Sequence, residues 1–124
     1  MFKTACAAAL LVFATTASAE AAGDLMTLAP HYNVSGTNPN GSHYAGTVDV
    51  DVISNTTFLV AWHIGSGTSS GFGMRMGDTI SATYLLGDKP GLIIYRANGA
   101  GGFKGIWAIR GQNGSGTETW TPAN

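Results

Sequence analysis

Short runs of alternating apolar and polar residues, interrupted by Gly, Asn, Asp and Pro about every 8–14 residues, extend from His31 to the end of the chain. This spacing is typical of an all-β barrel or sandwich. All the links are short, so no crossover helix fits between strands and each strand is expected to pair antiparallel with the next. The pattern predicts eight strands, at approximately residues 31–36, 43–53, 58–64, 71–76, 79–86, 92–97, 103–110 and 117–122.

The breaks between these runs have the composition of tight turns. Asn38-Pro39-Asn40-Gly41 places proline second and glycine fourth, as a type I turn prefers. Lys89-Pro90-Gly91 matches a type II turn with glycine at the position of positive φ. Asn98-Gly99 is a hairpin dipeptide. The turns therefore support a meander of consecutive hairpins.

Apolar residues gather on one face of the second predicted strand and on one face of the third. Directly opposed residues of an antiparallel pair share a face, so a loop with an odd number of residues, such as 55–57, is needed to bring the two apolar faces together. The two sets are Val48, Val50 and Val52, and Phe58, Val60 and Trp62.

Two mid-strand glycines predict that the sheet bends and closes. Gly46 and Gly105 each follow an aromatic residue by two positions, and such glycines permit sharp bends. The expected fold is an all-β, eight-stranded antiparallel up-and-down barrel over residues 31–124, a meander of the avidin or lipocalin kind. A barrel of eight strands is either filled by side chains or holds one small ligand. Trp62, Tyr84 and Trp107 are the candidates to line its interior.

Residues 1–19 have the three parts of a secretory signal peptide. Lys3 supplies a positive charge, residues 5–14 are apolar, and Ala17-Ser18-Ala19 is a cleavage site. The apolar run has about half of the ~20 residues that cross a bilayer, so no membrane anchor is expected after cleavage. Residues 20–30 are expected to be a flexible lead-in. The mature protein is predicted to be periplasmic or secreted.

Charge is scarce and evenly spread. The whole chain is 10% charged, and without the signal it keeps five cations and seven anions, a net charge of −2. No basic stripe is present, so nucleic acid is not an expected partner. The single cysteine, Cys6, leaves with the signal peptide, so the mature chain has no disulfide or thiol chemistry.

The polar residues form no recognisable catalytic or metal motif. His31, His43 and His63 lack the spacing of metal ligands, and neither a metal nor a cofactor is expected. Asp49 and Asp51 lie two apart on one strand face, and His63 is placed to meet Asp49 across the strands. We expect a solvated polar cluster there, and a hydrolase using these three residues is the least favoured function.

The last predicted strand contains an isolated acidic residue, Glu118, within the stretch 114–120. Two interpretations stand. Glu118 marks a recognition edge, or the strand closes the barrel with Trp120 packed inside and Glu118 pointing outward. The second interpretation is favoured.

Several motifs over residues 31–122 together resemble one family. It consists of small exported proteins of Rhizobium-like proteobacteria that are commonly labelled "fibronectin-binding protein". The resemblance implies binding of an extracellular-matrix protein and carries over no catalytic residues. The motifs are Val34-Ser35-Gly36-Thr37-Asn38-Pro39-Asn40-Gly41-Ser42, Tyr44-x-Gly46, Val60-x-Trp62-x-Ile64-Gly65, Gly71-x-Gly73-Met74 and Gly116-Thr117-Glu118.

The favoured function is that of an exported, non-enzymatic binding protein whose partner is a protein, such as a fibronectin-like host protein, or a small apolar ligand. The alternative is a periplasmic inhibitor of a hydrolase such as a lysozyme or protease. An inhibitor needs a rigid protruding loop, for which residues 66–70 and 111–116 are the candidates.

Overall fold

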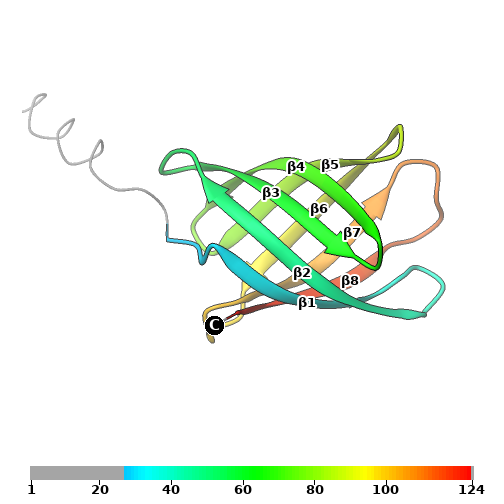
Figure 1. The fold of residues 1–124 in the computed structure, drawn as a ribbon, viewed down its shortest axis with the longest axis horizontal. Coiled ribbons are helices and arrows are strands. Elements are labelled where there is room, and N and C mark those ends of the chain that lie inside the picture. Colours follow the sequence, from blue (N-terminus) through cyan, green and yellow to red (C-terminus); the bar gives the residue numbers. More distant parts are fainter. Residues whose placement is uncertain (1–26, 124) are drawn as a thin grey trace, which may run out of the picture.

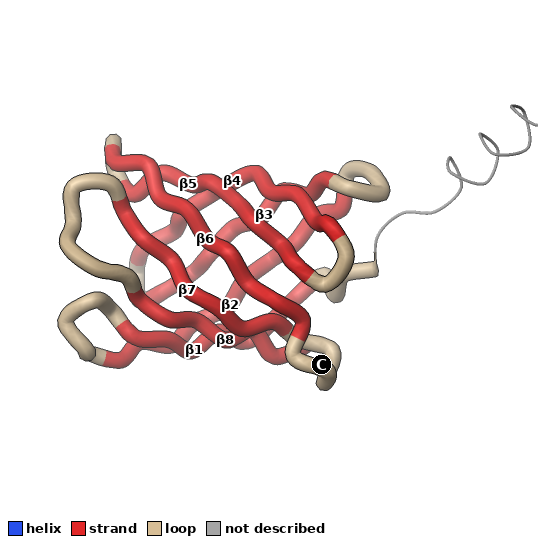
Figure 2. The backbone as a smooth tube through the Cα atoms, turned by 180° about the vertical axis from the view of Figure 1, so that it is seen from behind, coloured by secondary structure: helices blue, strands red, loops and turns tan. Residues whose placement is uncertain are grey.

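The computed structural model describes residues 27–123, so the predicted signal peptide and residues 20–26 lie outside the described residues. Eight antiparallel strands follow one another in chain order, and the last pairs with the first to close a barrel (Figures 1 and 2). The predicted all-β, eight-stranded up-and-down barrel is therefore confirmed. The strands are β1 (His31–Thr37), β2 (His43–Val52), β3 (Thr57–Ile64), β4 (Gly67–Met76), β5 (Thr79–Leu86), β6 (Lys89–Ala97), β7 (Phe103–Ile109) and β8 (Gly116–Pro122).

The register between β2 and β3 brings the two predicted apolar faces together. Val48 lies opposite Trp62, and Val50 lies opposite Val60. The link runs from the pair Val52–Phe58, which leaves an odd number of residues between the partners, as predicted. These side chains point into the barrel and are largely buried.

Two strands, β4 and β6, begin several residues earlier than their sequence pattern predicts. β4 starts at Gly67 rather than residue 71, and the predicted turn at Lys89-Pro90-Gly91 is instead the start of β6. The reversal occurs at Gly87, whose φ of 66° supplies the left-handed conformation that the turn requires. Gly91 lies buried under the ring of Tyr84, where a side chain would not fit.

Large apolar side chains close one end of the barrel. Trp120 is completely buried there, and its ring contacts the rings of Tyr32 and Phe103. The Arg75 guanidinium lies 5.4 Å from the centre of the Phe103 ring and donates to the carbonyl oxygen of Thr27. Residues 28 and 29 pack against the same core. The described start of the chain therefore covers this end, which we call the closed end.

The outer surface of the barrel has a polar side and an apolar side. Outward-facing residues of β1 and β8 are polar, among them Asn33, Ser35, Thr119 and Thr121. Large apolar side chains instead face solvent on β3, β4, β6 and β7. We call this set the outer apolar face: Leu59, Phe72, Met74, Leu92, Ile94 and Ile106. Within residues 27–123, no helix is long and apolar enough to cross a membrane.

Candidate functional site

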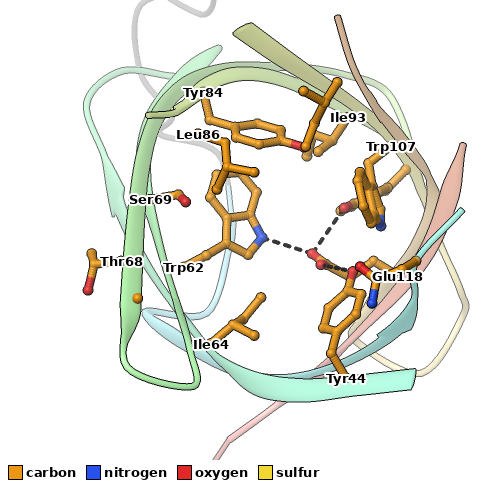
Figure 3. A pocket seen from close by; sticks show the side chains of 14 residues that line it. Tyr44, Trp62, Ile64, Thr68, Ser69, Tyr84, Leu86, Ile93, Trp107 and Glu118 are labelled. Carbon is orange, nitrogen blue, oxygen red and sulfur yellow. Dashed lines mark hydrogen bonds between the residues drawn. The ribbon is translucent and has the colours of Figure 1, made fainter. Parts of the chain in front are cut away.

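The end of the barrel opposite the closed end contains a cavity of about 330 Å³ (Figure 3). Trp62 on β3, Tyr84 on β5 and Trp107 on β7, the three interior candidates from the sequence, all line it. Tyr44 from β2 and Ile64 from β3 form much of the remaining apolar wall. These side chains surround the cavity and leave its centre unfilled. Exposed residues such as Thr68 and Leu86 form the rim.

Glycines on neighbouring strands explain why so many aromatic rings leave a cavity. A Cβ atom added at Gly36, Gly91 or Gly116 would overlap the ring of Tyr44, Tyr84 or Trp107, respectively. Each ring therefore lies against the backbone of the adjacent strand instead of extending across the barrel. These three glycines are not the two, Gly46 and Gly105, from which bending of the sheet was predicted, and they leave room for the interior at this end.

Glu118 lies inside the barrel and is only 3% exposed, so the favoured prediction that it points outward is wrong. Residues two apart on a strand share a face, and because Trp120 packs in the core, Glu118 must face inward as well. That spacing was the signal in the sequence that could have located it. A carboxylate this deeply buried is rare in proteins unless it is paired.

Four neutral groups donate hydrogen bonds to the Glu118 carboxylate. Tyr44 Oη donates to Oε1 at 2.6 Å. Trp62 Nε1 at 2.8 Å, Tyr95 Oη at 2.9 Å and Trp120 Nε1 at 2.7 Å all donate to Oε2. Indole nitrogens can only donate, so Oε2 must act as an acceptor. The donors come from four different strands, which no pattern within one strand reveals.

The cavity contains one acidic group and no basic one. Glu118 lines the cavity, and of the residues described by the structure no Lys, Arg or His does so. Burying a carboxylate away from water is costly, and the four donors offset part of that cost. The site therefore presents a negative group within an aromatic wall.

The four tyrosines of the chain are all partly or fully buried, and burial raises the pKa of each. The nearby Glu118 carboxylate raises the pKa of Tyr44 and Tyr95 further, and the pKa of Tyr84 reaches about 12. At neutral pH the tyrosine hydroxyls stay protonated, and those of Tyr44 and Tyr95 serve as donors to Glu118.

An alkaline titration is expected to show these raised tyrosine pKa values. Unfolded tyrosine loses its proton near pH 10, whereas the folded chain keeps its tyrosines protonated above that pH. The unfolded state therefore releases more protons, and the free energy of unfolding should fall as the pH rises from about 10 towards 12. Tyrosinate absorbance should appear together with loss of the near-UV circular dichroism signal. Ionisation of all four tyrosines near pH 10 in a folded protein would contradict this assignment.

The polar cluster predicted on the outer surface is present and larger than expected. Asp49 accepts hydrogen bonds from His31 Nδ1 at 2.7 Å and His63 Nε2 at 3.0 Å, and hydrogen bonding to these histidines lowers the pKa of Asp49. His63 also contacts the Thr68 hydroxyl at 3.3 Å, while Asp51 is exposed nearby. Solvent reaches all of these groups. Because water screens the electrostatic interaction between Asp49 and the two histidines, that interaction is too weak to activate a nucleophile.

Within residues 27–123, no group of three or more His, Cys, Asp or Glu side chains is placed to hold a metal ion. Residues 66–70 do not form a protruding loop, because β4 starts at Gly67 and pairs with β3 from there. The other proposed inhibitory loop, 111–116, does fall largely in the link between β7 and β8, although Gly116 already belongs to β8.

Comparisons with known proteins add support for the fold only. No protein-family model matches the chain, and no curated protein matches it. Among solved structures, a redesigned β-barrel is similar, with a TM-score of 0.65 and 22% sequence identity over 78% of this chain and 92% of that one. The chain is thus a β-barrel protein.

Proposed function

We propose that the protein is a non-enzymatic binding protein that takes one small, largely apolar molecule into the cavity of its barrel. The observation that carries this proposal is the cavity of about 330 Å³ bounded by aromatic rings that lie against the wall. Ligand pockets combine such apolar walls with a few polar groups that fix orientation. Glu118 and its donors supply the polar groups here.

The size of the cavity limits the ligand. Pockets for small molecules span about 300–1,000 Å³, so this cavity, at 330 Å³, lies at the lower limit. Because the opposite end is filled by Trp120, Tyr32 and Phe103, the ligand enters and leaves through the rim near Thr68 and Leu86. A molecule of one to three fused or linked rings suits these dimensions.

A neutral fluorophore tests the proposal directly. N-phenyl-1-naphthylamine is expected to gain fluorescence on binding with one-to-one stoichiometry. Ser69 faces the cavity opposite Trp62, so Ser69→Trp should fill the space and weaken binding at least about tenfold. Ser70→Trp makes the same change on the outward face of β4 and should leave the affinity within about twofold. Equal loss in both variants, or no binding to the wild-type chain, would refute the proposal.

We also propose that the protein acts after export, in the periplasm or outside the cell. The support is the tripartite sequence of residues 1–19, with its small-residue cleavage site ending at Ala19. The full chain expressed in a bacterium should be recovered from the periplasm or medium with Glu20 as its first residue. Recovery of an uncleaved chain in the cytoplasm would overturn this assignment.

The outer apolar face favours a second candidate function, binding of a protein partner such as the fibronectin-like host protein implied by the family resemblance. Exposed apolar patches of this kind often mark protein interaction sites. Leu92 and Ile94 are more than half exposed on β6. Immobilised fibronectin should bind the wild-type chain and lose binding to Leu92→Ser. Asn33→Ser, on the polar side, is the control. Equal binding by all three proteins, or by none, would reject this function.

A further inference from the structure

We infer that the ligand of the cavity carries a protonated amine that forms an ion pair with Glu118. This inference rests on the proposed function, because it specifies the chemical class of the small molecule. The class is an amphiphilic amine, in which a compact aromatic or aliphatic body is joined to a cationic N–H group. Three features of the site support it.

The first feature is the uneven hydrogen bonding of the carboxylate. Three donors, Trp62, Tyr95 and Trp120, occupy Oε2, whereas Tyr44 alone donates to Oε1. A carboxylate has about four lone-pair sites, two on each oxygen. Oε1 therefore retains acceptor capacity in a residue that lines the cavity, where a ligand N–H group can use it.

The second feature is the uncompensated charge. The four groups around Glu118 are neutral donors, and burial keeps the tyrosines among them protonated by raising their pKa values. Buried carboxylates are usually paired with a cation. Among the lining residues that the structure describes, none is cationic, so a protonated amine on the ligand would supply the opposite charge that the cavity wall lacks.

The third feature is the arrangement of aromatic rings around the carboxylate. The rings of Trp62 and Tyr84 lie 5.1 Å apart between centroids on one wall, and those of Tyr44 and Trp107 lie 6.2 Å apart on another (Figure 3). Aromatic faces attract cations, most strongly where water is excluded. The same rings also accommodate the apolar body of an amine.

These features disfavour the other classes of ligand. An anionic ligand such as a fatty acid would place a second negative charge beside Glu118, and like charges in a partly buried site repel strongly. A neutral alcohol can donate to Oε1, but a charge-assisted hydrogen bond is roughly twice as strong as a neutral one. The site therefore discriminates by charge rather than by shape alone.

Three probes of similar shape test the inference on the wild-type chain. Tryptamine is protonated at pH 7, indole-3-ethanol is neutral, and indole-3-propionate is anionic. By isothermal titration calorimetry, tryptamine should bind at least about tenfold more tightly than indole-3-ethanol, and indole-3-propionate should bind most weakly. Equal affinities, or tightest binding of the anion, would overturn the inference. Binding of the neutral probe without a preference for the amine would leave the proposed function intact, whereas failure of all three probes and of the fluorophore would remove both.

Variants of the carboxylate and its partner supply the second test. Glu118→Gln removes the charge at nearly constant size, and the preference for tryptamine should fall to within about threefold while indole-3-ethanol still binds. Asp51→Asn removes one negative charge from the exposed outer surface and should keep the full preference for tryptamine.

If Glu118→Gln does not fold, Tyr44→Phe supplies the test instead. It keeps the charge and frees Oε1 from a competing donor, so the preference for tryptamine should be retained or increased. Loss of that preference in Tyr44→Phe, or its survival in a folded Glu118→Gln, would contradict the ion pair.

Discussion

Replacing Glu118 with leucine is expected to lower the free energy of unfolding by about 4 kcal/mol. Leucine has a similar size, but it cannot accept the hydrogen bonds that Trp62, Trp120, Tyr95 and Tyr44 donate to the carboxylate. The two indole N–H groups can only donate hydrogen bonds, so they would remain buried without an acceptor. Because a small domain has only about 5–15 kcal/mol of stability, such a loss is severe.

Urea denaturation of the mature chain measures this effect, and Asp51→Leu is the matched control. Asp51 is exposed on the outer surface, so its replacement should change the free energy of unfolding by no more than about 0.5 kcal/mol. A loss below about 1 kcal/mol for Glu118→Leu would mean that the carboxylate does not organise the interior.

The second large effect is expected from Trp120→Ala, which should lower the free energy of unfolding by about 4 kcal/mol. Trp120 is fully buried, and its ring lies within 5.1–6.2 Å, centroid to centroid, of the rings of Tyr32, Phe103, Tyr95 and Trp62. Alanine would leave a large void between them and remove one donor from Glu118.

The two substitutions share a hydrogen bond, so their effects should not add. The double variant Glu118→Leu/Trp120→Ala is expected to lose at least about 1 kcal/mol less than the sum of the single variants. Trp107→Ala provides the comparison at the open end, where the ring is only partly buried, and should cost less than Trp120→Ala. Additive effects, or a greater loss for Trp107→Ala, would contradict the division into a filled closed end and an open cavity.

The order and approximate positions of the strands could be predicted because they depend on patterns within short segments of the sequence. Alternation on β2 and β3 fixed the facing residues, and turn residues such as Asn38 to Gly41 marked the reversals. The early start of β6 was missed because Lys89-Pro90-Gly91 has the composition of a turn, although Gly87 makes the reversal. Turn composition alone does not separate a turn from the first residues of a strand beside it.

The candidate site was harder to predict because its interactions are not local. The sequence indicated that Trp62, Tyr84 and Trp107 face the interior, but the position of their rings depends on glycines of the neighbouring strands. The role of Glu118 depends on donors from four strands, which become neighbours only once the barrel has closed. The spacing of Glu118 and Trp120 could have placed the carboxylate inside the barrel, where the favoured prediction did not put it. Its partners required the complete register.

The most direct test of the account follows the three tryptophan side chains during ligand binding. Trp62 and Trp107 line the cavity, while Trp120 lies in the closed end. In ¹H–¹⁵N correlation spectra of the mature chain titrated with N-phenyl-1-naphthylamine, the indole signals of Trp62 and Trp107 should shift far more than that of Trp120. Unchanged signals of Trp62 and Trp107, or shifts confined to backbone amides of the outer apolar face, would contradict a binding site inside the barrel.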